Sequence, residues 1–259
     1  MSDFNRNASV PRFGATAART QADIDQGLRA YMLRVYNYMT LGLAITGAAA
    51  LGVYMLAVSD VPTQYPFAGM YLTQFGATLF GSPLRWVVMF APLAAVFFLS
   101  FRVDRLSVGA AQSIFWVYAA LVGVSLSSIF IVYTHESIVR VFFITAAAFG
   151  GLSLYGYTTT RSLSGLGSFM IMGLIGVLIA MVVNIFLGST MLQFVISVAG
   201  VLVFAGLTAY DTQRIKEMYF AGDDDVVAGR KAVMGALTLY LDFINMFLML
   251  LQLFGNRNN

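Results

Sequence analysis

Long apolar stretches, separated by short polar ones, follow one another along most of this chain. The gaps between charged residues predict seven helices, at about 38–58, 84–101, 112–133, 139–157, 168–187, 191–210 and 232–254. Each is close to the roughly 20 apolar residues that a helix needs to cross a bilayer. A charge at the bilayer centre costs about 2.5–3.5 kcal/mol, which is why charges delimit the helices. The pattern therefore predicts an all-α integral membrane protein with seven transmembrane helices.

Two places along this pattern depend on special residues. The stretch from Ser162 to Tyr210 carries no charge and is too long for one helix, and Leu187-Gly188-Ser189 supplies a tight turn within it. The second predicted span is short and contains Pro92. Proline lacks an N–H, so it kinks a helix unless neighbouring groups satisfy the freed carbonyl.

The chain before the first span divides into a polar, arginine-bearing tail and a helical lead-in. Apolar residues of the lead-in recur at helical spacing, at Ile24, Leu28, Met32, Val35 and Met39. We therefore expect a cytoplasmic N-terminal tail with an amphipathic lead-in over 1–35, a seven-helix transmembrane domain over 36–254 and a short C-terminal tail over 255–259.

Composition supports a membrane domain and narrows the chemistry. Hydrophobic residues make up 59% of the chain and charged residues only 10%, against about 25% charged in ordinary soluble domains. The absence of cysteine excludes disulfides, thiol nucleophiles and cysteine-ligated metals. The net charge of +3 comes from residues beside the spans, so we expect the lipid bilayer as a partner and no nucleic acid.

Lys and Arg residues also predict the orientation, because they gather on the cytoplasmic side of membrane proteins. The side opposite the N-terminus keeps only Arg85, Arg140 and Arg257 of the 15 basic residues. We therefore expect a multi-pass protein of the cell (inner) membrane with its N-terminus in the cytoplasm and its C-terminus on the other side.

The last predicted span carries a polar stripe on one helix face, formed by Thr238, Asp242, Asn245, Met249 and Gln252. A carboxylate at that depth must be neutralised, paired or hydrated, so Asp242 should face the bundle interior or a cavity. Ionisable residues within spans are functional by default. The alternative is a protonated Asp242 that only hydrogen-bonds a neighbouring helix.

Asp211 ends the sixth predicted span in the string LTAYDTQRIKEMY, one turn after Thr208. It could be solvated there, or paired with Arg214. Adjacent spans with a short connection pack antiparallel, however, so Asp211 and Asp242 can meet. Two carboxylates that share a site cannot both ionise easily. Such a pair would be a proton sensor and a cation site at once.

Other polar residues are weaker candidates. Arg102 and Arg105 close the second span on the same side, and either could latch onto an ionised Asp211 through a bidentate bond or simply be a positive-inside residue. Some hydroxyl and amide side chains could line a pathway: Thr208, Thr238, Asn245, Ser125 and Ser128. Alternatively, they only form hydrogen bonds across helices. The run Asp223-Asp224-Asp225 lacks the ligand spacing of an EF-hand, so we expect a solvated turn.

Enzyme chemistry has little support. The last span carries its only lysine, Lys231, at one edge, whereas a retinal Schiff base needs a lysine in mid-membrane. The sole histidine, His135, lies in a predicted outer loop, which excludes a Ser–His protease or a histidine metal site within the bilayer. Neither aspartate has the Gly-x-Gly-Asp context of an intramembrane protease. We therefore expect no enzyme and no cofactor.

The strings FAGLTAYDTQRIKEMY and ALTLYLDFINMFLMLLQLFG resemble the C-terminal hallmark of the Bax inhibitor-1 family, also called the transmembrane Bax inhibitor motif family. GLSLYGYTTTRSLSGLGSF and YAALVGVSLSSIF resemble its middle spans, and the long arginine-bearing tail is typical of bacterial members. The resemblance, over about 30–254, implies a seven-helix bundle with a closed or openable pore and a pH-sensitive calcium leak. It also implies a di-aspartyl sensor at Asp211 and Asp242, with the arginine latch on Arg102 or Arg105.

The residues and the resemblance together give three hypotheses for the function, and the resemblance makes Ca²⁺ the cation that Asp211 and Asp242 would bind. The leading hypothesis is a leak of Ca²⁺ that closes when ionised Asp211 pairs with arginine and opens on protonation, so that Ca²⁺ and H⁺ are the expected partners. Because bacterial relatives are associated with membrane-protein quality control, the second is a non-conducting regulator of a membrane-bound protease or another stress-response partner. The third is a proton-coupled cation exchanger, against which the lack of an inverted repeat argues mildly.

Overall fold

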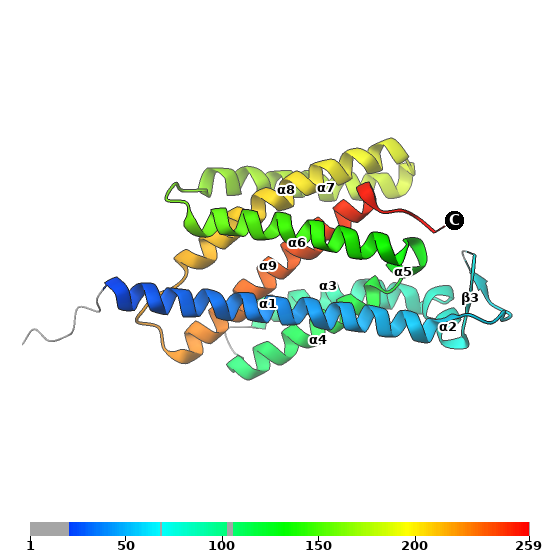
Figure 1. The fold of residues 1–259 in the computed structure, drawn as a ribbon, viewed down its shortest axis with the longest axis horizontal. Helices are drawn as coiled ribbons and strands as arrows, with labels where there is room; N and C mark the ends of the chain where they lie inside the picture. Colours follow the sequence, from blue (N-terminus) through cyan, green and yellow to red (C-terminus); the bar gives the residue numbers. More distant parts are fainter. Residues whose placement is uncertain (1–20, 68, 103–105, 259) are drawn as a thin grey trace, which may run out of the picture.

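The helices are arranged in two layers around a central helix, α9 (Asp225–Phe254). The computed structural model describes residues 21–67, 69–102 and 106–258. One layer contains α1 (Gln21–Ala57), α3 (Leu84–Arg102) and α4 (Val108–Leu126), and the other contains α6 (His135–Thr158), α7 (Ser164–Leu187) and α8 (Thr190–Glu217) (Figure 1). Helix α9 packs against α1, α4, α6 and α8. It therefore contributes more buried residues to the core than any other helix of the described structure.

Within the described ranges, six helices are long and apolar enough to cross a membrane. A seventh crossing results when α2 (Gln74–Gly81) and α3, which are bent by 68° relative to each other, form one span. Helix α7 exposes many large apolar side chains, including Ile175, Ile179 and Phe186, as a lipid-facing helix does. The all-α, seven-span fold predicted from the sequence is confirmed, with the bent pair as the seventh span.

Three helices extend beyond the predicted spans. Helix α1 already begins at Gln21, so the amphipathic lead-in and the first span form one helix, while α8 continues to Glu217 and α9 begins at Asp225. The predicted spans at 191–210 and 232–254 stopped at the nearest charged residues. A helix continues through charged positions when their side chains are buried with partners or reach the bilayer surface, so charge gaps mark the apolar part of a helix and not its ends.

The connection between α1 and α2 contains a small sheet that was not predicted. Strands β1 (Val58–Ser59), β2 (Pro66–Phe67) and β3 (Met70–Leu72) pair antiparallel in the order β1-β3-β2, with Val58 opposite Leu72. Gly69 has φ 80°, the left-handed conformation that a tight turn between β2 and β3 requires. The sheet closes the end of α1 against the start of α2.

Pro92 does not break the helix that contains it. Helix α3 continues from Leu84 to Arg102, and the bend of this crossing lies before it, at residues 82–83. The carbonyl of Val88, which Pro92 leaves without an N–H partner, instead accepts a hydrogen bond from the Ser125 hydroxyl of α4. The stated exception applies here: a neighbouring helix satisfies the freed group, and the helix continues through Pro92.

The turn between α7 and α8 is as predicted. Helix α7 ends at Leu187, Gly188 takes the left-handed conformation with φ 61°, and the Ser189 hydroxyl accepts a hydrogen bond from the N–H of Leu192. This combination of a C-terminal glycine and an N-cap serine reverses the chain within two residues.

The C-terminal tail is bound to the start of α6 and to α5 (Ile129–Val132). The N–H of Thr134 donates to the carbonyl of Asn256 at 2.9 Å, and the N–H of Asn256 donates to the Ser137 hydroxyl at 2.8 Å. The N–H of Asn258 donates to the carbonyl of Val132 at 2.9 Å. These bonds hold the end of α9 to α5 and to the start of α6.

Candidate proton and cation site

Asp211 of α8 and Asp242 of α9 lie against each other inside the bundle. Their side chains are within hydrogen-bonding reach of one another, and the residues are only 8% and 4% exposed. Asp242 Oδ2 is fully buried and has no hydrogen-bond partner among the described residues. The structure thus brings the two predicted acids into one site and leaves one oxygen there free to bind a proton or a cation.

The surroundings of Asp211 exclude the simpler alternatives for this residue. Helix α8 continues for six residues after Asp211, to Glu217, so the carboxyl is not at a helix end. It is buried, whereas Arg214 is exposed and forms no ion pair with it. Asp211 is therefore neither a solvated helix terminus nor half of a surface ion pair.

Small residues bring α8 and α9 close enough for the two acids to meet. A Cβ on Gly235 of α9 would lie 3.0 Å from the Ile215 side chain, and a Cβ on Gly200 of α8 would lie 2.9 Å from Met249. These contacts lie on either side of the Asp211–Asp242 pair along the antiparallel helices. Close approach at small residues is how helices pack without water, and here it fixes the register of the acids.

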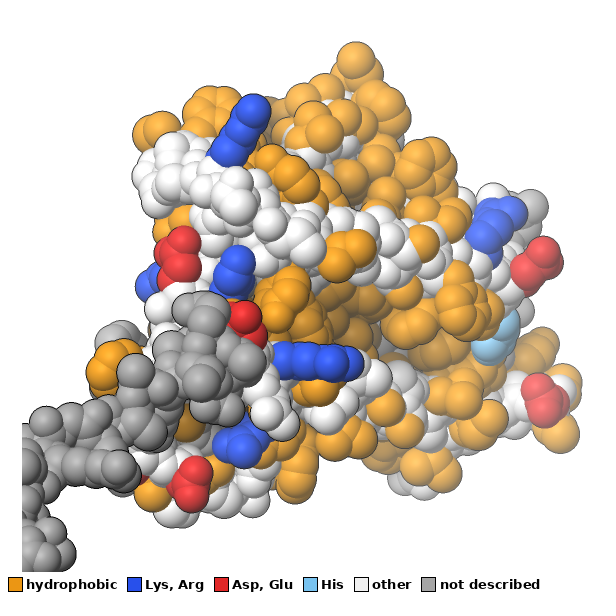
Figure 2. Space-filling model, turned by 60° about the vertical axis from the view of Figure 1, so that its left-hand side comes forward, with side chains coloured by type: hydrophobic (Ala, Val, Ile, Leu, Met, Phe, Trp, Pro, Cys, Tyr) orange, Lys and Arg blue, Asp and Glu red, His pale blue; other side chains and the backbone are white. Residues whose placement is uncertain are grey.

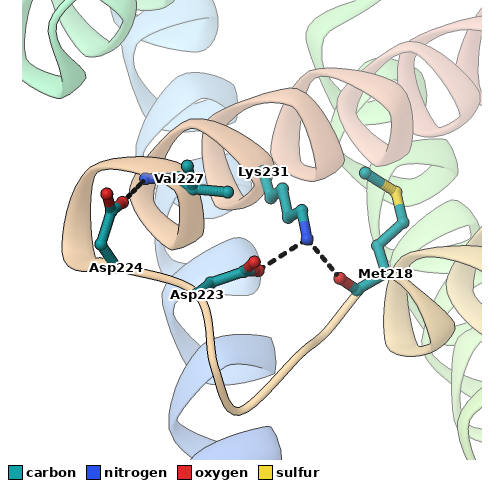
Figure 3. Close-up of polar contacts among 5 residues, drawn as sticks. All are labelled: Met218, Asp223, Asp224, Val227 and Lys231. Atoms are coloured by element: carbon teal, nitrogen blue, oxygen red, sulfur yellow. Dashed lines mark hydrogen bonds and ion pairs between the residues drawn. The ribbon is translucent and has the colours of Figure 1, made fainter.

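The loop between α8 and α9 is an ordered structure and not merely a solvated turn (Figure 3). Lys231 Nζ forms an ion pair of 2.6 Å with Asp223 and donates to the carbonyl of Met218 at 3.0 Å. Asp224 accepts a hydrogen bond from the N–H of Val227 at 2.7 Å and caps α9. Asp224 and Asp225 are exposed, as expected for a solvated turn, while the ion pair of Asp223 with Lys231 also fixes the start of α9 to the end of α8.

The polar residues predicted to line a pathway are mostly bonded within their own helices. Thr208 donates to the carbonyl of Phe204 at 2.7 Å, Thr238 to that of Met234 at 3.1 Å, and the Asn245 amide to that of Leu241 at 2.8 Å. Such bonds satisfy the donors, while the oxygens remain able to accept. Thr208 is fully buried, one turn before Asp211.

Ser125 and Ser128 lie elsewhere. Both line a cavity of about 480 Å³ between α3 and α4, together with Arg85 and Trp86, and neither acid contributes to its wall. Ser125 is occupied by the Val88 carbonyl. The structure therefore does not bring these serines to the Asp211–Asp242 site.

The two latch candidates fall at the edge of the described structure. Arg102 is the last residue of α3, and its side chain, like all of Arg105, lies outside the described residues. The arginine latch accordingly stays a prediction.

A chain of hydroxyl groups next to the acids was missed by sequence reasoning. The hydroxyls of Tyr36 (α1) and Ser153 (α6) share a hydrogen bond of 2.6 Å, those of Ser153 and Thr212 (α8) share one of 3.0 Å, and Thr212 also bonds the carbonyl of Thr208 at 2.7 Å. Thr212 directly follows Asp211. The consecutive polar residues of YDTQ were the only signal, because their partners come from distant helices.

Gln213 was missed for the same reason. Its buried amide accepts from the N–H of Leu163 at 2.8 Å and donates to the carbonyl of Arg161 at 2.9 Å. The N-cap residue of α7, Leu163, forms no side-chain capping bond. The Gln213 side chain of α8 supplies a hydrogen bond at this helix end instead. Next along the string, Lys216 donates to the carbonyl of Tyr157 at 2.8 Å at the end of α6.

A permanent metal site is not built here. The described residues contain no group of three or more His, Cys, Asp or Glu that could hold a metal ion. Ca²⁺ takes six to eight oxygen ligands, and the Asp211–Asp242 pair offers only its carboxylate oxygens. The pair alone therefore supplies fewer protein ligands than a Ca²⁺ ion takes.

Comparison with known proteins agrees with this architecture. The family described as inhibitor of apoptosis-promoting Bax1 matches residues 28–259. The chain is 44% identical to the protein RP147 of Rickettsia prowazekii, over 94% of this chain and 97% of that protein. It is also 44% identical to a Caulobacter vibrioides protein, over 98% of each chain. It is 45% identical to the Escherichia coli inner membrane protein YbhL, over 89% of this chain and 93% of that protein. The chain therefore belongs to the Bax inhibitor-1 family.

Proposed function

We propose that this protein is a pH-sensitive leak for Ca²⁺ across the inner membrane, with Asp211 and Asp242 as its proton sensor and cation site. The observation that supports this most directly is the contact between two buried carboxyl groups, one of which keeps an unpartnered oxygen. Buried acids on facing helices are costly unless they bind a proton, a cation or each other. The N-terminus is cytoplasmic in this proposal, and the relative YbhL is named as an inner membrane protein.

The charge of the pair sets the direction of control. When Asp211 is ionised, one of two arginines binds it and closes the pathway: Arg102, the last residue of α3, or Arg105, three positions later in the sequence. Protonation removes the negative charge that attracts the guanidinium, and the latch opens. Because the two acids share one site, they exchange protons as a unit, so the flux should change over one pH interval and not two independent ones.

The test is Ca²⁺ flux from liposomes that contain the purified full-length protein, measured over a range of pH. The double variant Asp211→Asn/Asp242→Asn should lose the pH dependence, because an amide does not titrate. Asp225→Asn, an exposed acid in the first turn of α9, is the matched control and should keep it. Arg102→Ala or Arg105→Ala, whichever is the latch, should raise the flux at neutral pH.

Two results would contradict the proposal. Equal flux from the double variant and the unmodified protein at every pH would show that the acids neither sense protons nor carry the ion. Protein without any flux, but with one stoichiometric partner recovered by crosslinking in both forms, would identify a non-conducting regulator. A pH-sensitive dye inside the same liposomes separates a leak from an exchanger, which would move protons in a fixed ratio to Ca²⁺.

A further inference from the structure

Helices α1 and α6 face each other across a long apolar groove. Two cavities, of about 630 Å³ and 420 Å³, lie along it and share Leu43, Phe142 and Phe243 in their walls. They are therefore parts of one groove, with α1 and α6 as its sides and Phe243 of α9 in its floor. Figure 2 shows a hollow lined with hydrophobic side chains between the two layers.

The groove has the length of a membrane. The residues that line it on α1 run from Arg29 to Leu51, and those on α6 run from Tyr157 back to His135. At 1.5 Å per residue each side is about 33 Å long. The hydrocarbon core of a bilayer is about 30 Å thick, so the groove extends from one surface of the membrane to the other.

One end of the groove carries an arginine and several hydroxyl groups. The wider cavity is lined there by Arg29, Tyr36, Ser153 and Tyr157, where α1 begins and α6 ends. Farther along, the walls are mostly apolar, with Thr40, Thr46 and His135 among them. Arg29 is exposed and forms no ion pair with any described residue. The hydrogen bond between Tyr36 and Ser153 joins the two walls there. A cation at the membrane surface above an apolar channel matches a molecule with a phosphate and long hydrocarbon chains.

We propose that the groove between α1 and α6 binds a phospholipid, whose phosphate lies at Arg29 and whose acyl chain extends toward Phe142 and Phe243. The lipid comes from the leaflet at the beginning of α1, which is the cytoplasmic leaflet in the orientation proposed above. A volume of about 630 Å³ is in the usual range for a ligand pocket. A basic residue near the bilayer surface attracts anionic lipid.

Two glycines keep the groove open and supply the test. A Cβ at Gly47 of α1 or Gly150 of α6 would meet no atom within 4 Å, and both residues line the groove. Gly151 also has open space around it but is not part of the groove wall. At Gly150 the Cβ of a leucine is accommodated and the rest of its side chain would occupy groove space, whereas Gly151→Leu puts the same side chain one residue away, outside the groove wall.

The probe is a phosphatidylglycerol with a photoactivatable group at the end of one acyl chain, in phosphatidylcholine vesicles that contain the full-length protein. Crosslinked peptides are identified by mass spectrometry. Labelling should concentrate on the facing sides of α1 and α6 and should fall about tenfold with Gly150→Leu, while Gly151→Leu leaves it unchanged. Arg29→Gln should lower labelling by phosphatidylglycerol about fivefold, whereas Arg34→Gln, an exposed residue outside the groove, should not.

The proposal is overturned if Gly150→Leu and the unmodified protein are labelled equally, or if the outer face of α7 is labelled as strongly as the groove. It is also overturned if the groove is covered by protein, which would appear as crosslinks from α1 or α6 to a second chain without lipid label. Binding is measured independently of ion flux, so failure of this inference and failure of the proposed leak are distinguishable.

Discussion

The Ser125 hydroxyl on α4 donates a hydrogen bond of 2.5 Å to the main-chain oxygen of Val88 on α3. Pro92 lies four residues after Val88 and has no N–H, so this oxygen lacks the partner that a helix would normally supply. One side chain thus completes the backbone bonding of a neighbouring helix. The same bond holds α3, which packs mainly against α4 and α2, to the rest of its layer.

This relationship predicts a rescue. Ser125→Ala should lower the free energy of unfolding by about 0.5–2 kcal/mol, because the Val88 oxygen loses its donor. Adding Pro92→Ala restores an N–H four residues after Val88, so the double variant should regain most of the loss. Thermal unfolding in detergent measures the effect, with Ser128→Ala as the control. A loss that is the same with and without Pro92→Ala would contradict the assignment.

A pair of glycines on α6 should respond in opposite ways to the same change. A Cβ on Gly156 would lie 2.1 Å from the backbone oxygen of Ala209 on α8, whereas a Cβ on Gly151 would meet nothing within 4 Å. Gly156→Ala should therefore destabilise the protein by about 3 kcal/mol. Gly151→Ala should be neutral or stabilising by up to about 1 kcal/mol, because alanine favours the helix. Equal effects in a thermal unfolding assay would show that α6 and α8 do not cross at Gly156.

Gln213 allows its two hydrogen bonds to be tested separately. Gln213→Leu removes both hydrogen bonds and should lower the free energy of unfolding by about 1–2 kcal/mol. Gln213→Glu keeps an acceptor for the N–H of Leu163 but has no donor for the carbonyl of Arg161, so it should lose less. Hydrogen exchange at the Leu163 amide should be fast in Gln213→Leu and remain slow in Gln213→Glu. Slow exchange in both would show that Gln213 does not cap α7.

The ion pair of the α8–α9 loop predicts a measurable coupling between Lys231 and Asp223. Lys231→Met and Asp223→Asn should each lower the free energy of unfolding. The double variant should lower it by less than the sum of the two single losses, and the difference, the coupling energy, should be about 1 kcal/mol. The coupling should weaken in high salt because part of each side chain is exposed. Purely additive effects in chemical unfolding would mean that the pair contributes nothing to the loop.

The helices were predictable because runs without charge in a membrane protein have few alternative structures. Six of the charge gaps coincide with helices long and apolar enough to cross a membrane, and the gap at 84–101 coincides with the α3 half of the bent pair. Gly188 marked a turn that the structure contains. The helix ends were not predictable from charge, since the carboxyl of Asp211 is buried inside α8 and the charged residues at the start of α9 form caps and an ion pair. Position along the sequence does not say whether a charge is solvated or paired.

Antiparallel packing of adjacent spans allowed Asp211 and Asp242 to meet, but the pairing was predicted only through the family resemblance of the strings AYDTQ and LYLDFIN. The structure places the two side chains together. Their role in sensing protons stays a prediction. The bonds of Tyr36, Ser153 and Gln213 were not predictable, because each joins residues at least 50 positions apart. Ser125 was predicted to line a pathway, but its hydroxyl stabilises a proline-containing helix. A polar residue in a span has several possible partners, and only the packing selects one.

The bonds of the C-terminal tail bear on how this bundle can move. Helix α9 is tied at its start by Lys231 to the end of α8, and just after its end by Asn256 and Asn258 to α5 and α6. Helix α9 cannot slide along its axis without breaking these bonds. We therefore expect Asp242 to keep its position along α9, and any motion that uncovers it to come from the helices packed around it, α1, α4, α6 and α8.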